Sequence, residues 1–342
     1  MELSIIIPTF NRSALLKKTL QSIVEQEQTG IVFEVIVVDN GSTDETPDVS
    51  QSFAGSISHF IYHYDDEPGQ LTGRHRGTEL ATARIISFID DDVELNPFWI
   101  RSVLELFNTS PDISIIGGPC LPKYQLYPPS WINYFRETTP YGGTACLPLS
   151  LIDLGEGNFE IDPLYVFGLN FSIRKNVLLE LGGFHPDCIP AHLQKFQGDG
   201  ETGLSLKARN RGVKAMYAAS VFLYHQVVPE RLTANHFEKW YYYSGVCQSF
   251  TDLRKKHLPL ASERVSTATR SRLARVVSAP GKILKNLFPA KKDVPPKILQ
   301  LQTKFNMMYH SGYRFHQDAF ETDSRVRDWV LRTDYWNYKL PG

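Results

Sequence analysis

Four short apolar segments alternate with helix-like segments over the first 92 residues, and this alternation constrains the fold more than any other feature. Each apolar run ends at Pro, Asn or Asp, which is typical of strands buried on both faces of a sheet. Parallel strands need a crossover between them, and a helix is the usual one. The sequence therefore predicts an α/β fold with a doubly wound, mostly parallel sheet. The expected strands cover residues 4–8, 33–39, 60–66 and 85–92.

The pattern changes after residue 96. A helix over 98–109 and a strand over 113–119 precede a region, 120–165, that is rich in Pro, Tyr and Trp and has no clear periodicity. Aromatic loops of this length beside a sheet often form part of a binding wall. We expect one domain over 1–250, in two halves at 1–110 and 111–250, and a C-terminal helical and basic extension at 251–342.

A basic segment at 254–297 contrasts with the rest of the chain. It holds twelve Lys or Arg against two acids, whereas the formal net charge of the whole chain is −1. Its apolar residues suit an anionic membrane interface, and a solvated linker is the alternative. No nucleic-acid-binding motif accompanies the charge, so nucleic acid is not an expected partner. No signal peptide or apolar run of about 20 residues occurs, which predicts a cytoplasmic protein or one peripheral on the inner face of the membrane.

Polar residues follow each predicted strand, at the edge where open α/β sheets bind ligands. Three consecutive carboxylates after the fourth strand would repel one another unless a cation lay beside them. Alternate residues of an extended segment point the same way, so Asp90 and Asp92 can face one cleft and hold Mg²⁺ or Mn²⁺. The alternative is a helix cap formed by Asp92 or Asn96. The other candidates at this edge are Thr9, Asn11, Arg12, Asp39, Asn40, Gly41 and Ser42.

Two arginines lie in the segment LTGRHRG, which reads as a loop bounded by Gly73 and Gly77 before a helix at 77–83. Arg74 and Arg76 can donate forked, charge-assisted hydrogen bonds to phosphate oxygens. The alternative is that they are surface arginines that cap a helix.

Four motifs in order, SIIIPTFNR, VIVVDNGSTD, LTGRHRG and FIDDDVELNP, resemble the nucleotide-sugar half of family-2 glycosyltransferases with a GT-A fold. The resemblance covers about residues 1–110, and looser features continue to about residue 250. It implies that 1–110 is the nucleotide-sugar-binding half and 111–250 the acceptor-side half. It implies a metal-dependent, inverting transferase of polysaccharide biosynthesis. Such an enzyme moves a sugar from a nucleotide-diphospho-sugar, here a UDP-sugar, to a hydroxyl of a glycan or lipid-linked acceptor.

The resemblance also implies roles for individual residues. Asp39 would contact the uracil or ribose, Arg74 the diphosphate, and Asp90 and Asp92 the metal. His75 stands where the family usually has Asn. The residues expected to bind the nucleotide sugar are Pro8, Thr9, Asn11, Arg12, Asp39, Ser42, Arg74 and Asp91.

An inverting transfer needs a base that takes the proton of the acceptor hydroxyl. The segment QGDGETGLSL offers Asp199 and Glu201 among glycines that let the backbone approach a substrate. The resemblance puts Glu201 at the position of the base, with Asp199 as the alternative, although the family usually has a Glu-Asp pair there. Either acid could instead cap a helix N-terminus. The resemblance also implies that His225 completes the metal shell, while a merely hydrogen-bonded histidine is the alternative.

Two other functions remain open from the sequence. A nucleotidyltransferase that makes the sugar nucleotide would carry a Gly-rich loop with a basic residue near the first strand, and no such run follows Pro8. A non-catalytic nucleotide-sugar-binding protein would bind the donor without turnover.

Overall fold

The computed structural model describes residues 1–258, 294–336 and 338–341. The chain forms two compact units. Unit 1 comprises Met1–Gln194, Gly200–Thr233 and Asp334–Gly342, and unit 2 comprises Lys195–Asp199 and Ala234–Thr333. The expected boundary at residue 250 falls inside helix α7 (Ala234–His257), and the units divide at Thr233 instead. Most of the basic segment 254–297 lies outside the described residues.

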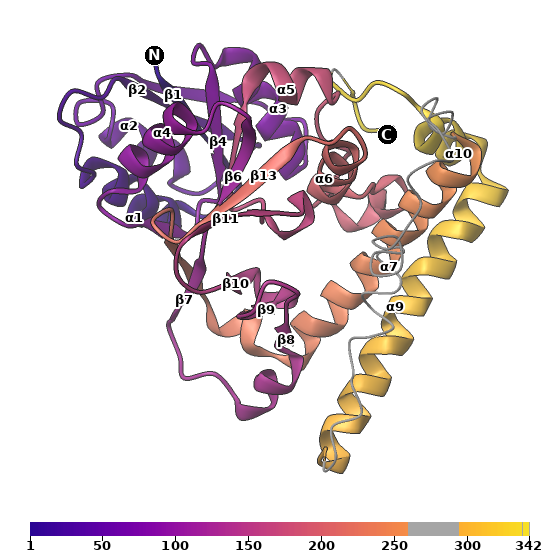
Figure 1. Ribbon diagram of the computed structural model, residues 1–342. Coiled ribbons are helices and arrows are strands. Elements are labelled where there is room, and N and C mark those ends of the chain that lie inside the picture. The colour runs from indigo at the N-terminus through magenta and orange to yellow at the C-terminus, as the bar shows by residue number, and fades with distance from the viewer. Residues whose placement is uncertain (259–293, 337, 342) are drawn as a thin grey trace, which may run out of the picture. The chain divides into compact units, whose positions relative to one another are not determined.

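Unit 1 is built on an eight-stranded sheet in the order β11-β13-β6-β12-β4-β1-β2-β3 (Figure 1). The strands β3, β2, β1 and β4 pair in parallel, as do β6 and β13, whereas β12 and β11 are antiparallel to their neighbours. The predicted mostly parallel α/β sheet is thus confirmed. The strands are β1 (Leu3–Thr9), β2 (Phe33–Asp39), β3 (Phe60–Tyr64), β4 (Ile85–Ile89), β6 (Ile113–Gly117), β11 (Asn158–Ile161), β12 (Asn170–Arg174) and β13 (Lys214–Ala218).

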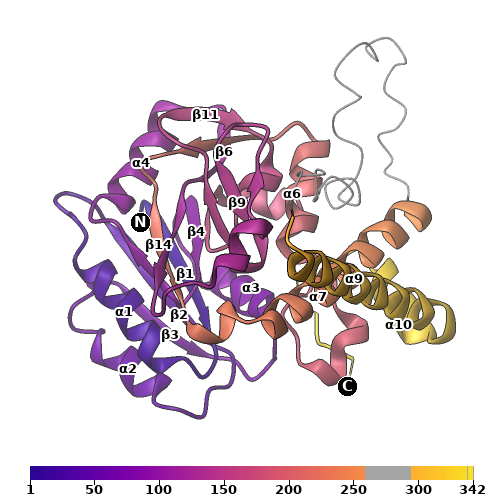
Figure 2. The same ribbon diagram turned by 90° about the horizontal axis from the view of Figure 1, so that it is seen from below.

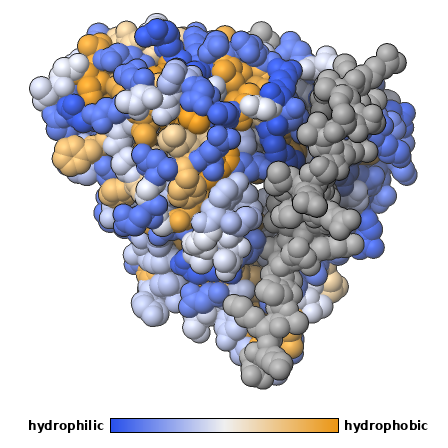
Figure 3. Space-filling model, in the orientation of Figure 1, coloured by the Kyte–Doolittle hydropathy of each residue, from blue (hydrophilic) through white to orange (hydrophobic). Residues whose placement is uncertain are grey.

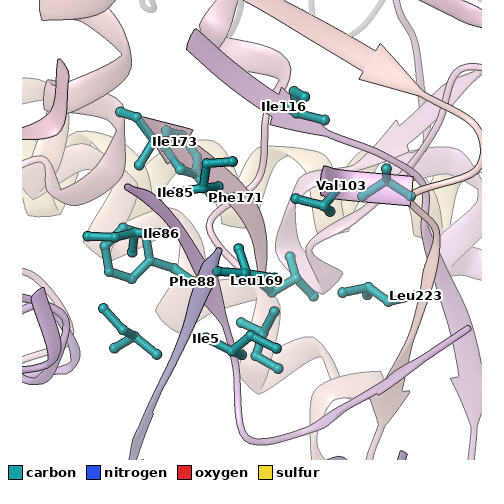
Figure 4. Close-up of a cluster of buried hydrophobic side chains, with 14 of the residues drawn as sticks. Ile5, Ile85, Ile86, Phe88, Val103, Ile116, Leu169, Phe171, Ile173 and Leu223 are labelled. Carbon is teal, nitrogen blue, oxygen red and sulfur yellow. The ribbon is translucent and has the colours of Figure 1, made fainter. Parts of the chain in front are cut away.

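Helices cover both faces of this sheet (Figure 2). Strands β1, β2 and β4 are buried along their whole length, which explains their unbroken apolar runs. Side chains from β1, β4, β6 and β12 meet in the core (Figure 4). The helices on one face are α1 (Ser13–Val24), α2 (Thr46–Ser52) and α4 (Trp99–Thr109), and those on the other include α3 (Gln70–Leu80) and α6 (Gly200–Asn210), while α5 (Lys175–Glu180) follows β12.

Helix α3 differs from the sequence prediction, because it begins at Gln70 and includes the segment that reads as a loop. Gly73 and Gly77 lie one turn apart on the helix. A Cβ on Gly73 would lie 2.6 Å from Asn40 Oδ1 and 2.8 Å from Pro8 Cβ, and one on Gly77 would collide with Ile6. These glycines therefore allow α3 to lie close against β1 rather than forming a loop.

A six-stranded second sheet in unit 1 has the order β5-β14-β7-β10-β9-β8. The region 120–165, predicted as an aromatic binding wall, supplies four of these strands. Its rings pack on one another: Trp131 lies edge-on to Phe135, and Tyr141 edge-on to Tyr165. The strands are β5 (Val93–Leu95), β7 (Cys120–Tyr124), β8 (Glu137–Thr138), β9 (Thr144–Cys146), β10 (Leu151–Asp153) and β14 (Leu223–Val227).

Unit 2 consists mainly of α7, α9 (Pro296–Thr322) and α10 (Ser324–Leu331). Helices α7 and α9 lie side by side (Figure 1). Glu238 contacts Lys304, and further along both helices Ser249 contacts His316, so the two helices run parallel. On the face shown in Figure 3, hydrophobic residues lie in small groups among hydrophilic ones. Within the part of the chain that the structure describes, no helix is long and apolar enough to cross a membrane.

Candidate functional site

Three consecutive aspartates connect β4 to β5, because β4 ends at Ile89 rather than at residue 92. Asp92 is fully buried, and its Oδ2 lies 3.0 Å from Arg12 Nη2 and 3.1 Å from Arg231 Nη2. Asp91 accepts hydrogen bonds from Arg12 Nη1 at 2.7 Å and from the Thr9 hydroxyl at 2.8 Å. The segments that follow β1, β4 and β14 thus meet around the acidic triplet.

The three carboxyl groups have different electrostatic environments. Burial raises the pKa of Asp91 to about 7, although the Arg12 guanidinium opposes this rise. Burial also favours the protonated form of Asp92, but the attraction of His225, Arg231 and Arg12 outweighs it and holds the pKa of Asp92 below its usual range. The pKa of Asp90 is raised, mainly by burial, against the opposing charge of Arg74. Asp92 is therefore the most firmly ionised carboxylate of the triplet.

His225 lies on β14 with its ring buried beside Asp92. Its Nδ1 is 2.9 Å from the carbonyl oxygen of Leu149, which can only accept, so Nδ1 carries a proton, and in the neutral ring the lone pair is on Nε2. Nε2 lies 3.4 Å from Asp92 Oδ2. Both His225 Nε2 and Asp92 Oδ1 are buried without a hydrogen-bond partner. Two such atoms with a fixed histidine tautomer fit the ligand set of a divalent cation.

Asp90, the predicted third ligand, has partners of its own. Asp90 Oδ1 accepts hydrogen bonds from Gln70 Nε2 at 2.6 Å and from Arg74 Nη2 at 3.0 Å. Among the described residues, no three His, Cys, Asp or Glu side chains lie together as a group that could hold a metal ion. Asn96, named in the capping alternative, accepts from the Phe98 N–H at 3.0 Å in the turn before α4, and the N-cap of that helix, Phe98, makes no side-chain cap hydrogen bond.

Arg74 is 1 % exposed and lies between two aromatic rings, with Cζ 5.6 Å from the Phe88 centroid and 5.5 Å from the Phe184 centroid. Its Nη2 also donates to the carbonyl oxygen of Gly168 at 2.9 Å, and its Nη1 donates to Glu201 Oε2 at 2.8 Å. Both terminal nitrogens thus have partners within unit 1, and the guanidinium joins Asp90 to Glu201. The contact of Arg74 with a diphosphate stays a prediction. Arg76 also meets acids, because its Nε donates to Asp65 at 2.7 Å.

The two candidate bases differ in environment. Glu201 lies in the first turn of α6, and its side chain is 40 % exposed. Gly200 before it has φ 54°, in the left-handed region, and a Cβ there would lie 2.6 Å from Asp187 Oδ2. Asp199 belongs to unit 2, where it is buried and accepts from the Thr251 hydroxyl at 2.7 Å. Of the two, Glu201 is therefore the carboxylate that solvent reaches.

The loops after β1 and β2 are bonded to each other. Asn11 adopts φ 53°, its N–H donates to Ser42 Oγ at 2.8 Å, and its Oδ1 accepts from the Thr43 N–H at 2.7 Å. Asp39 is buried and accepts from the Ser42 N–H at 2.8 Å and from the Tyr62 hydroxyl at 2.7 Å. Pro8 is buried in β1, where it faces Gly73 of α3. Of these residues, Asn11 and Ser42 have the more accessible positions.

Sequence reasoning missed three residues of this region. Arg231 contacts Asp92, Gln70 contacts Asp90, and Tyr62 contacts Asp39. Gln70 lies one turn before Arg74, so recognising helix α3 would have placed both side chains on one face. Tyr62 lies inside a predicted strand, and nothing in its neighbourhood distinguishes it. Arg231 lies shortly after His225 in the sequence, but only the fold shows that it contacts the acidic triplet.

Comparisons with known proteins all find glycosyltransferases. The family model described as "Glycosyl transferase family 2" matches residues 4–140. The glucosyl-dolichyl phosphate glucuronosyltransferase of Haloferax volcanii is 27 % identical over 187 residues, which are 54 % of this chain and 56 % of that protein. The validoxylamine A glucosyltransferase of Streptomyces hygroscopicus subsp. limoneus is 29 % identical over 199 residues, 54 % of this chain and 44 % of that protein. The match thus spans about half the length of these curated relatives.

Among solved structures, the mannosyltransferase PcManGT from Pyrobaculum calidifontis in complex with GDP-Man and Mn²⁺ has 16 % sequence identity and a TM-score of 0.49. The similarity covers 95 % of this chain and 75 % of that chain.

Proposed function

We propose, since residues 4–140 match the model of glycosyl transferase family 2, that unit 1 transfers a sugar from a UDP-sugar to a hydroxyl of a glycan or lipid-linked acceptor, with inversion. One observation carries the proposal most directly. The buried Arg74 contacts both Asp90, in the acidic triplet after β4, and Glu201, the accessible acid of α6. A donor held at the triplet would then lie close to a group that can accept a proton.

A divalent cation, Mn²⁺ or Mg²⁺, fits this proposal. Asp92 Oδ1 and His225 Nε2 are the buried atoms without partners that would hold it. Asp90, two residues before Asp92, is the proposed further ligand. When bound, such a cation neutralises charge that develops on a diphosphate leaving group. Arg12 and Arg231, whose side chains are 31 % and 22 % exposed, can donate forked hydrogen bonds to phosphate oxygens.

Glu201 is the proposed base. As the acceptor oxygen bonds to the anomeric carbon, the bond from that carbon to the diphosphate oxygen breaks, and Glu201 takes the hydroxyl proton. Arg74 orients Glu201 through Oε2 and offsets its charge, so we assign Arg74 a positioning role. Asp39, Ser42 and Asn11, at the ends of β1 and β2, are the proposed contacts of the nucleoside.

The relatives support the acceptor classes. One is named for transfer to glucosyl-dolichyl phosphate and the other for transfer to validoxylamine A, so lipid-linked and free saccharide-like acceptors both occur among them. A membrane-peripheral location at the cytoplasmic face would suit a lipid-linked acceptor.

The test compares Asp92→Ala, Glu201→Gln and the matched control Glu160→Gln, an exposed acid of β11. We expect Asp92→Ala to lose Mn²⁺-dependent UDP binding, measured by calorimetry. Glu201→Gln should keep that binding but lose sugar transfer, measured with a panel of UDP-sugars and acceptors, while Glu160→Gln should behave as the wild type. Binding of UDP-sugars by the wild type with no turnover would instead identify a non-catalytic binding protein.

A further inference from the structure

The last described residues of the chain pack against the part of unit 1 that carries the proposed donor site. We call residues 334–336 and 338–341 the C-terminal segment. The Tyr338 hydroxyl lies 2.7 Å from Thr72 Oγ1 on α3, and Tyr338 is 2 % exposed. The Trp336 ring lies 4.5 Å from the His75 ring, on the same helix. The segment therefore contacts α3 at two positions about one helical turn apart, Thr72 and His75.

The contact with His75 continues to Arg74. His75 Nε2 accepts a hydrogen bond from the Phe184 N–H at 2.9 Å, and the Phe184 ring lies under the Arg74 guanidinium. A Cβ on Gly183 would lie 2.6 Å from His75 Nε2 and 3.2 Å from the Trp336 ring, so this packing leaves no free space. Loss of the Trp336 ring would loosen His75 and Phe184, and with them the side chain that joins Asp90 to Glu201.

A third contact of the C-terminal segment lies near Asp39, one of the proposed contacts of the nucleoside. The Leu340 N–H donates to Glu67 Oε1 at 2.7 Å. The carbonyl oxygen of Glu67 in turn accepts from Asn40 Nδ2 at 3.2 Å, and Asn40 directly follows Asp39. The C-terminal segment thus contacts both elements that flank the proposed donor site, the loop before α3 and α3 itself.

We propose that Trp336 and Tyr338 are positioning residues for the nucleotide donor. They contact no substrate themselves and act by holding α3 and the loop at Glu67 in the conformation that binds it. This inference rests on the proposed function. Pre-organised groups lose less conformational freedom when a ligand binds, so the segment raises donor affinity. Because coupling between two sites is reciprocal, a bound donor must hold the segment more firmly by the same factor.

The experiment uses the full chain with Tyr338→Phe, which removes one hydroxyl, and Trp336→Ala, which removes the ring. Phe159→Leu is the matched control, because Phe159 packs on Tyr141 and Tyr217 in the same unit. UDP with Mn²⁺ is the probe, and calorimetry measures its Kd. We expect Tyr338→Phe to raise this Kd about three- to tenfold, as the loss of one hydrogen bond predicts, and Trp336→Ala to raise it further. The control should leave it unchanged.

Hydrogen exchange supplies the readout that a purely structural role would not change. In the wild type, UDP with Mn²⁺ should slow exchange of the amides of Tyr338 and Leu340, and Trp336→Ala should speed exchange over residues 70–80. Unchanged UDP affinity in both variants, or a C-terminal segment whose exchange ignores UDP, would overturn the inference. If the wild type binds no UDP, the proposed donor is wrong. In that case the contact between the C-terminal segment and α3 is still tested separately. Unaltered hydrogen exchange over residues 70–80 in Trp336→Ala would show that the segment does not hold α3.

Discussion

Arg74 Nη1 lies 2.8 Å from Glu201 Oε2, although 127 residues separate the two in the chain. The guanidinium is buried, whereas the Glu201 side chain is 40 % exposed. A buried cation thus holds an accessible carboxylate through one oxygen and fixes its orientation. The same cation reaches Asp90, so the acidic triplet and the proposed base share one partner.

Replacing Arg74 should be costly in two ways. Arg74→Ala removes a fully buried guanidinium and leaves Asp90, whose side chain is 22 % exposed, without that partner; we expect a loss of about 3–5 kcal/mol in the free energy of unfolding, measured by urea denaturation. Arg74→Lys keeps the charge but cannot bridge Asp90 and Glu201 with a fork. We expect it to fold, with kcat lowered more than the donor KM is raised. Wild-type kcat in Arg74→Lys would contradict the positioning role, and Arg211→Ala, a change on the surface, is the control.

The substitution His225→Asn tests the roles of the two ring nitrogen atoms separately. The Asn side-chain amide can still donate to the carbonyl oxygen of Leu149, as Nδ1 does, but it offers nothing in place of Nε2. We expect a folded protein whose Mn²⁺ affinity, followed by electron paramagnetic resonance, falls about tenfold or more. A Mn²⁺ titration identical to that of the wild type would remove His225 from the ligand set.

Gly168→Ala tests the space around the ion pair. A Cβ at this position would overlap the Glu201 carboxylate and lie 2.8 Å from Arg74 Nη1. We expect the pair to separate, with a loss of about 1–3 kcal/mol in stability and a marked fall in kcat. Gly55→Ala is the control, because a Cβ there meets nothing within 4 Å. Equal activities for the two variants would show that the pair tolerates displacement.

The lowered pKa of His316 predicts part of the pH dependence of the free energy of unfolding. Its buried ring contacts Ser249 on α7, and burial lowers its pKa to about 4. An unfolded chain has a histidine pKa near 6.5, so between these values the unfolded state binds more protons and stability falls as the pH falls. The difference amounts to about 3 kcal/mol at pH 4. Urea denaturation from pH 7 to pH 4.5 should therefore show a shallower pH dependence for His316→Gln than for the wild type. Parallel curves would contradict the assignment.

The strands could be predicted where burial is uniform. In β1, β2 and β4 both faces are covered, so most positions are apolar and the run itself reveals the strand. Helix α3 could not be read this way. Its Gly73 and Gly77 suggest a loop by local propensity, and only the closeness of Asn40 and Ile6 explains why a helix has glycine there.

The residues of the candidate site could be predicted from the sequence better than the contacts between them. The position after each strand indicated Arg12, Asp39 and the acidic triplet. The partners of Asp92 come from far along the chain, since Arg231 lies 139 residues away, and local patterns carry no record of such pairs. For the same reason the sequence could not show that Arg74 binds two acids of its own chain.

The bond between Tyr338 and Thr72 spans 266 residues, and this separation affects how the chain folds during its synthesis. A ribosome adds about 5–20 residues per second. Helix α3 therefore leaves the exit tunnel about 13–50 s before the side chains that cover it exist. During that interval the surface around Thr72 and His75 is exposed to chaperones and to other nascent chains. Slower translation of the second half would lengthen that exposure.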